Sequence, residues 1–251
     1  MSVIIKLKES VNRIVNASAL KSGISKIEKY KNKYSNERCF IIGNGPSLSV
    51  IDLEKLKNEY TFAANRIYKI YERTAWRPSF YCVQDYDVIM ASYKSINNIS
   101  ESKKFVGITP TRHYPALKDC IAFKLVLDIK PYPELPGFSI DPAFGLYNSF
   151  TVTYACIQIA CYMGFKKIYL IGVDHKYSVE KKADGTVVKH EGLKDHFDDN
   201  DKIDNIPQLD KSTLAYMAAK EYAYKHGIEI YNATRGGALE VFPRIDFDTL
   251  F

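Results

Sequence analysis

The sequence lacks several patterns that mark common classes of protein. No stretch in its 251 residues approaches the roughly 20 consecutive apolar residues of a membrane-spanning helix. The opening segment MSVIIKLKES is too short and too charged for a secretory signal. The five cysteines form no Cys-x-x-Cys pair and lie in apolar runs, which is typical of reduced core residues. These absences predict a cytoplasmic protein without disulfides.

Two common nucleotide-binding motifs are also missing. The segment CFIIGNGPSL, residues 39–48, passes from an apolar run into a turn that contains Gly43 and Gly45. The third glycine of a dinucleotide fingerprint is absent and no acidic residue ends the next predicted strand, so NAD binding is only weakly indicated. The Gly-Lys-Ser/Thr of a P-loop is absent as well, which excludes Walker-type phosphate transfer. A strand, a glycine turn and a helix start remain, and backbone amides in such a turn favour an anion.

Positive charge is concentrated at the N-terminus. Eight Lys or Arg residues and only two Glu lie in residues 1–35, an excess equal to the net charge of +6 of the whole chain. A neutral body with a basic arm argues against nucleic-acid binding. Apolar residues between these charges fit a broken amphipathic helix, which either contacts an anionic membrane surface or packs on the body with a solvated basic face. We therefore predict a basic amphipathic segment over 1–35 and a catalytic α/β domain over 36–251.

Short apolar runs alternate with helical patterns throughout residues 36–251. Strands are predicted over 38–43, 60–65, 79–85, 104–109, 120–127, 166–174 and 228–233. Helices are predicted over 49–60, 149–165 and 212–227, with Ser149 and Ser212 as candidate caps. This repeated strand–helix–strand order predicts α/β architecture with a single doubly wound, mostly parallel, Rossmann-like sheet. The long charged segment at about 175–208 interrupts the order and has the character of an active-site lid.

The order of these motifs resembles the glycosyltransferase family 42 sialyltransferases. It also resembles the related 6-hydroxymethylpterin pyrophosphokinase-like family, which includes the central domain of flagellin glycosyltransferases that use nonulosonic acids. IIGNGPSL resembles the nucleotide turn of these proteins, and AAN at 63–65 resembles their nucleotide-contacting strand end. The segments 150–174 and 218–243 resemble their long helix, Gly-x-Asp strand end and closing helix and strand. The resemblance covers about 38–251 and implies a sialyltransferase-like fold with a lid.

The resemblance implies nucleotide or donor contacts at several strand ends. Asn44 and Asn65 would hold the phosphate, ribose or base, and Thr151 would approach the donor from the start of the apolar helix. Asp174 would accept hydrogen bonds from ribose or base hydroxyls, with a helix cap or a loop ion pair as the alternative. The candidate binding set also contains Gly43, Gly45, Ser47, Asp85, Gly172 and Arg235. For Arg235 a solvated surface turn is the alternative.

His196 lies in DHF, where the related family carries its catalytic histidine, and is the candidate general base. Sugar transfer needs a base for the acceptor hydroxyl, and histidine changes protonation near neutral pH; a solvated lid histidine is the alternative. Asp195 or Asp198 would orient or tune it. Lys176 and Tyr177 stand where the sialyltransferases use lid tyrosines to stabilise the leaving phosphate.

One position departs from the family pattern. Ser149 occupies the register in which some members carry an arginine, so recognition of the donor's carboxylate differs or the donor is not a sialic acid. No metal site is predicted, because the segment 195–205 lacks the spacing of a calcium loop and His190 and His196 lack zinc spacing.

The leading prediction is an inverting, metal-independent glycosyltransferase that needs no cofactor. It would move a sialic-acid-like nonulosonate from a CMP donor to a cell-surface glycan or lipooligosaccharide at the cytosolic membrane face. One alternative is Mg-ATP-dependent pyrophosphoryl transfer to a hydroxymethylpterin, with carboxylates from Asp85, Asp174 and the acidic cluster at 198–201. The other is a non-catalytic nucleotide-binding protein. The sugar, acceptor and oligomeric state are left open by the sequence.

Overall fold

The main sheet of the protein is parallel throughout. The computed structural model describes residues 3–127, 130–198 and 205–251, and within them the sheet has eight strands in the order β10-β7-β1-β2-β3-β4-β5-β6. Every neighbouring pair is parallel. The strands are β1 (Arg38–Ile42), β2 (Tyr60–Ala64), β3 (Phe80–Val83), β4 (Lys103–Ile108), β5 (Cys120–Val126), β6 (Leu146–Tyr147), β7 (Lys167–Ile171) and β10 (Glu229–Asn232). The predicted doubly wound Rossmann-like sheet is confirmed.

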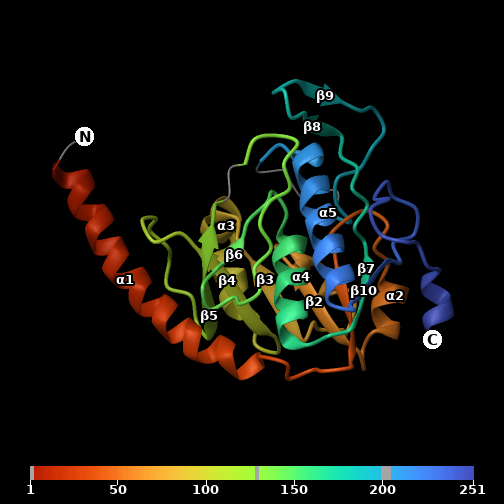
Figure 1. The fold of residues 1–251 in the computed structure, drawn as a ribbon, viewed down its shortest axis with the longest axis horizontal. Coiled ribbons are helices and arrows are strands. Elements are labelled where there is room, and N and C mark those ends of the chain that lie inside the picture. The colour runs from red at the N-terminus through yellow and green to blue at the C-terminus, as the bar shows by residue number, and fades with distance from the viewer. Residues whose placement is uncertain (1–2, 128–129, 199–204) are drawn as a thin grey trace.

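Helices cover both faces of this sheet (Figure 1). One apolar cluster joins a sheet face to α4 (Val152–Met163) and α5 (Leu209–Lys225). A second cluster joins the opposite face to α2 (Val50–Lys55), α3 (Tyr86–Asn98) and the short 3₁₀ segments η2 (Ile67–Ile70) and η3 (Phe247–Leu250). Burial on both faces explains why the strands read as continuous apolar runs rather than alternating ones.

Two helices begin at residues other than the predicted caps. Thr151, not Ser149, is the N-cap of α4, because its side chain accepts a hydrogen bond from the Thr153 amide at 3.3 Å. α5 begins at Leu209, and the hydroxyl of Ser212 donates to the Leu209 carbonyl from inside the first turn. The predicted end of α4 is confirmed, since Gly164 has the left-handed φ of 93° that favours glycine.

Several strands are shorter than predicted because polar residues at their ends have other roles. β3 ends at Val83, and Asp85 caps α3 by accepting hydrogen bonds from the amides of residues 87 and 88. β7 ends at Ile171, and Gly172 turns the chain with a φ of 63°. These polar side chains therefore lie in loops just beyond the carboxyl edge of the sheet, where open α/β proteins bind ligands.

The basic N-terminal segment is one continuous helix, α1 (Val3–Ile27), followed by the 3₁₀ segment η1 (Glu28–Tyr30), so the predicted break is wrong. Its second half packs on β5, where a Cβ on Gly23 would lie 1.9 Å from the Ala122 carbonyl oxygen. Its first half extends outward at the left of the view, apart from the lid at the upper right (Figure 1). Among the described helices, none is both long and apolar enough to cross a bilayer.

The predicted lid connects β7 to α5. It carries an antiparallel hairpin of β8 (Val179–Lys181) and β9 (Val187–Lys189), which lies beyond the carboxyl edge of the sheet (Figure 1). Residues 199–204, which hold part of the predicted acidic cluster at 198–201, lie outside the described residues.

Candidate functional site

A pocket of about 740 Å³ lies at the carboxyl edge of the sheet, beneath the lid. Its volume falls within the range of sites for small organic ligands. Most of the predicted site residues line it: Gly43, Asn44, Gly45, Asn65, Asp85, Thr151, Gly172, Asp174, Lys176, Tyr177 and His196. Residues from loops far apart in the sequence thus meet at one site because parallel strands end at the same edge. Ser47 and Arg235 are not part of the lining.

The turns after β1 and β7 pack directly on each other, which explains the two glycines of GNG. A Cβ on Gly43 would lie 2.3 Å from the Gly172 carbonyl oxygen, and a Cβ on Gly45 would lie 1.9 Å from Asp174 Oδ2. The Gly43 amide donates to the Ile171 carbonyl at 2.8 Å, and the Gly45 amide donates to the Gly172 carbonyl at 2.9 Å. Neither amide is therefore available to an anion, and the predicted phosphate contact through these two amides is corrected. The glycines permit close backbone approach.

Asp174 joins the same two turns through its side chain. Its Oδ2 accepts a hydrogen bond from the Ser47 hydroxyl at 2.7 Å and one from the Ser47 amide at 3.4 Å. Burial raises the pKa of this carboxyl group above its ordinary value, and the Ser47 hydrogen bonds oppose that shift. Ser47 thus acts on the pocket indirectly, by holding the Asp174 carboxylate at its wall.

Asn44 and Asn65 line the pocket, and each has a buried side-chain oxygen. The Asn44 amide nitrogen donates to the Ala64 carbonyl at 3.0 Å, which defines the orientation of its amide group. Asn65 has a left-handed φ of 52° at the end of β2. Within the described part of the chain, the side-chain oxygens of both residues are buried without a hydrogen-bond partner. Since an unpaired buried acceptor is unfavourable, both positions suit ligand groups that donate, such as hydroxyls or amines.

The lid places His196 beside the turn after β1. The Phe197 amide donates to the Asn44 carbonyl at 2.9 Å, and the His196 ring meets the Tyr177 ring edge-on with centroids 6.3 Å apart. Burial raises the pKa of the Tyr177 phenol, which keeps it protonated and able to donate. Lys176 lines the pocket from an exposed position.

The acidic neighbours of His196 make contacts of their own. Both carboxylate oxygens of Asp195 accept hydrogen bonds from Ser178, one from its amide at 2.6 Å and one from its hydroxyl at 2.7 Å. Asp198 pairs with Lys69 at 2.9 Å. These contacts hold the two ends of the His196 loop in place. The predicted role of Asp195 or Asp198 in orienting the imidazole directly is therefore replaced by a role in anchoring its loop.

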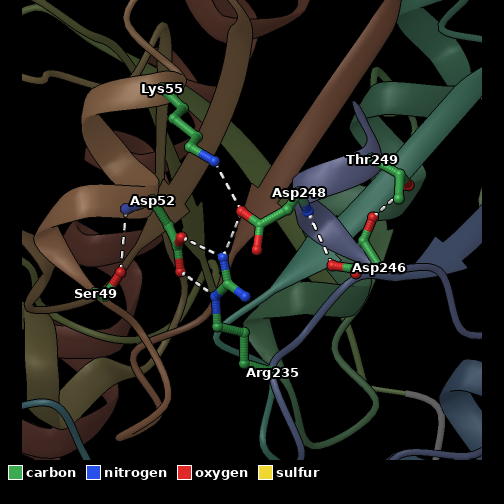
Figure 2. Close-up of polar contacts among 7 residues, drawn as sticks. All are labelled: Ser49, Asp52, Lys55, Arg235, Asp246, Asp248 and Thr249. Carbon is green, nitrogen blue, oxygen red and sulfur yellow. Dashed lines mark hydrogen bonds and ion pairs between the residues drawn. The ribbon is translucent and has the colours of Figure 1, made fainter. Parts of the chain in front are cut away.

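Arg235 lies outside the pocket, in a network of ion pairs that joins its turn to α2 and to η3 near the C-terminus (Figure 2). Its guanidinium donates twice to the buried Asp52 carboxylate, at 2.9 Å each, and once to Asp248 at 2.8 Å. Asp248 also accepts from Lys55 at 2.7 Å, and these cations lower its pKa. Arg235 is thus engaged in a tertiary ion-pair network rather than a solvated turn, and its guanidinium does not reach the predicted donor site.

Among the lining residues that the sequence analysis did not single out, three carry polar groups of interest. Gln84 directly follows β3 and precedes Asp85, His175 follows Asp174, and Arg112 lies in the loop after β4. Burial lowers the pKa of His175 to about 4, and its Nε2 lies 2.8 Å from the Thr213 hydroxyl. Since that hydroxyl donates to the Leu209 carbonyl, Nε2 carries the proton that His175 donates. Adjacency to predicted residues was a usable signal for Gln84 and His175, whereas Arg112 had none.

In residues 3–127, 130–198 and 205–251, no group of three or more His, Cys, Asp or Glu side chains is placed to hold a metal ion.

Fold and pocket together define a Rossmann-like α/β protein with a pocket at the carboxyl edge of its sheet. The chain belongs to the 6-hydroxymethylpterin diphosphokinase MptE-like family, whose model matches residues 12–180. It is similar in fold to the MAf glycosyltransferase from Magnetospirillum magneticum AMB-1, with a TM-score of 0.53 and 15% identity over 92% of this chain and 39% of that one. The chain therefore corresponds to well under half of that protein. No curated protein matches the sequence.

Proposed function

We propose that the protein is a glycosyltransferase that moves a sugar from a nucleotide-activated donor to an acceptor hydroxyl. The observation that carries this proposal is the hydrogen bond from the Phe197 amide to the Asn44 carbonyl. It holds the loop with His196 against the turn that would receive the nucleotide. A candidate base and a candidate nucleotide site thus share one pocket, which is the arrangement that transfer to a hydroxyl needs. The fold shared with a glycosyltransferase supports this reading.

The free acceptors favour a nucleoside with hydrogen-bond donors. Asn44 and Asn65 offer side-chain oxygens, which accept from ribose hydroxyls or a base amine but repel phosphate oxygens. The phosphate would instead lie toward the Lys176 ammonium and the Tyr177 phenol, both donors. A CMP donor fits this division because cytosine carries an exocyclic amine. The proposed acceptor is a cell-surface glycan or glycolipid.

The proposed reaction is a single displacement. The acceptor oxygen forms a bond to the anomeric carbon while an imidazole nitrogen of His196 takes the hydroxyl proton. The bond between the anomeric carbon and the phosphate oxygen breaks, and its electron pair leaves on CMP. Lys176 and Tyr177 would stabilise the charge that grows on that phosphate. Attack opposite the leaving group inverts the anomeric centre.

Substitution of His196 tests this chemistry. His196→Gln should leave CMP binding intact and reduce the rate of CMP release from a CMP-nonulosonate plus acceptor by roughly 10²- to 10⁴-fold. His113→Gln is the matched control, since His113 is exposed and outside the pocket lining. Equal rates for His196→Gln and the wild type would exclude His196 as the base. CMP binding without turnover in either protein would instead favour a non-catalytic nucleotide-binding protein.

Family membership supports a second candidate, diphosphoryl transfer from Mg-ATP to 6-hydroxymethylpterin. Two of the carboxylates considered for that reaction, Asp85 and Asp174, line the pocket, although both already accept hydrogen bonds. A thermal-shift panel of CMP, CDP, UDP, GDP and ATP, each with and without Mg²⁺, separates the candidates. Stabilisation by CMP without metal supports the glycosyltransferase. Stabilisation by ATP with Mg²⁺ alone, followed by AMP release with the pterin, would replace it with the diphosphokinase.

A further inference from the structure

The end of the pocket at β3 and β4 holds a buried acceptor that the proposed nucleotide contacts do not use. Gln84 is only 5% exposed, and its Nε2 donates to Asn148 twice, to the carbonyl at 3.2 Å and to Oδ1 at 2.8 Å. Those bonds define the amide orientation and leave Oε1 facing away from them. Among the described residues, no group donates to Oε1. A buried acceptor on a pocket wall points to a ligand hydroxyl or N–H at that position.

The same pocket is lined by an exposed arginine whose loop is held by the N-terminal helix. Arg112 lines the pocket, with its guanidinium carbon 4.7 Å from the centroid of the Tyr86 ring. Its loop is held from α1 by Asn16, a residue only 5% exposed. The Asn16 amide nitrogen lies 2.8 Å from the Arg112 carbonyl and 2.9 Å from that of Pro110. Asn12, one turn earlier, donates to the Thr111 carbonyl at 3.2 Å.

The position of this pair along the sheet limits what it can contact. Gln84 and Arg112 follow the adjacent strands β3 and β4, whereas the proposed nucleotide contacts follow β1, β2 and β7. Three strand spacings between β1 and β4 amount to about 14 Å. Asn65, after β2, lies one strand spacing from Gln84 and two from Arg112, so the pair adjoins the proposed nucleotide contacts and suits the sugar attached to the nucleotide or the acceptor. The other cations of the lining follow different strands: Arg66 follows β2, and Lys176 and Lys181 lie in the lid after β7.

We infer that Gln84 and Arg112 form a subsite for an acidic sugar, in which Arg112 binds a carboxylate or phosphate and Gln84 accepts from a neighbouring hydroxyl or N–H. Asn16 is its positioning residue. This inference rests on the proposed function and narrows its substrate class to a donor or acceptor sugar that carries an oxyanion. A guanidinium donates paired hydrogen bonds to such a group, so the subsite should bind sugars that carry an oxyanion more tightly than neutral sugars. Arg112 would also supply the positive charge that the uncharged Ser149 does not provide.

Calorimetric titration of the full chain with three probes tests the subsite: CMP, CMP-N-acetylneuraminate, and sialyllactose in the presence of CMP. Arg112→Gln should leave CMP affinity unchanged and weaken one acidic-sugar probe by roughly 10- to 100-fold. If Arg112→Gln weakens the binding of CMP-N-acetylneuraminate, the oxyanion belongs to the donor. If it weakens the binding of sialyllactose, the oxyanion belongs to the acceptor. Arg73→Gln, an exposed arginine outside the pocket lining, is the matched control.

Two further variants separate binding from positioning. Gln84→Met removes the acceptor oxygen without adding a charge, so it should weaken the acidic-sugar probe while CMP affinity stays constant. Asn16→Asp has no amide donor and should weaken the same probe as Arg112→Gln while CMP affinity stays constant. Failure of CMP to bind the wild type would overturn the proposed function and this subsite with it. Unchanged binding of both acidic probes in Arg112→Gln, with CMP bound, would overturn the subsite alone.

The face of α1 that points away from the sheet has an exposed apolar stripe, and this observation is independent of the pocket. Leu7, Val11, Ile14 and Val15 are 65%, 52%, 73% and 61% exposed, and their spacing puts them on one side of the helix. The packing residues Asn16, Gly23 and Ile27 lie on the opposite side. We further infer that this apolar stripe docks on an anionic lipid surface, because it lies in the segment that holds the chain's entire positive excess.

Sedimentation with mixed phosphatidylglycerol–phosphatidylcholine vesicles tests this docking. The full chain should bind these vesicles, bind less at high salt, and lose binding in Ile14→Glu. Ile51→Glu is the matched control, since Ile51 on α2 is 74% exposed, close to the 73% of Ile14. Binding that survives Ile14→Glu would overturn the proposal. A dimer in lipid-free solution that Ile14→Glu dissociates would do so as well, by showing that a second copy covers the stripe.

Discussion

Two glycine turns of this protein look alike in sequence and serve different purposes. The turn after β1 (Gly43–Gly45) and the turn after β10 (Arg235–Gly237) each set glycine beside a polar side chain at a strand end. In the first, Cβ atoms have no room, and the backbone itself forms part of the pocket wall. In the second, Gly236 has open space, and Arg235 turns away to Asp52 and Asp248 (Figure 2). Neighbouring elements, not the local pattern, decide which turn lines the pocket.

Adding one methyl group to each turn gives the sharpest contrast. Gly45→Ala should lower the free energy of unfolding by about 2–4 kcal/mol and abolish nucleotide binding, because its Cβ would lie 1.9 Å from Asp174 Oδ2. Gly236→Ala has no atom within 4 Å of its Cβ, so only its φ of 70° is unfavourable, at about 1 kcal/mol. Urea unfolding and CMP titration measure both. Equal stability of the two variants would show that the contact between the β1 and β7 turns can yield.

The pH dependence of the free energy of unfolding tests the burial of His175, which lines the pocket just after Asp174. Its pKa of about 4 in the folded protein lies below the ordinary value of 6.5, so the unfolded chain binds the proton first. Stability should therefore be greatest above about pH 6.5 and fall toward pH 4, by at most about 3 kcal/mol from this group. His175→Gln should flatten the curve in that window, and His226→Gln, an exposed histidine, should not. A curve unchanged by His175→Gln would contradict the assignment.

The Arg235 network should matter for stability alone. Arg235→Gln leaves the buried Asp52 carboxylate without its paired donors and should lower the free energy of unfolding by about 1–2 kcal/mol. CMP affinity should stay the same, because Arg235 lies outside the pocket lining. Lys225→Gln, which loses an exposed pair with Glu221, is the control and should cost less than about 1 kcal/mol. Weaker CMP binding by Arg235→Gln would contradict this expectation and support the predicted contact of Arg235 with the donor.

The sequence by itself determined the α/β class, the parallel sheet and the edge where the pocket lies. Apolar runs that end in Gly43, Asn65 and Asp174 mark strands whose polar ends must leave a core that buries both faces of the sheet. The helix-cap predictions were less accurate, since Ser149 and Thr151 are both good caps and only the structure shows which side chain accepts a bond.

Tertiary structure alone decided which polar groups remain free for a ligand. Arg235 and Asp52 are 183 positions apart in the chain, and Asn16 and Arg112 are 96 apart, so no local pattern announces either pairing. The Gly43 and Gly45 amides are likewise taken by the turn after β7. A strand end shows in sequence because burial imposes a period along the chain. A free donor or acceptor depends on every group that folding brings within hydrogen-bond distance, and those groups come from distant segments.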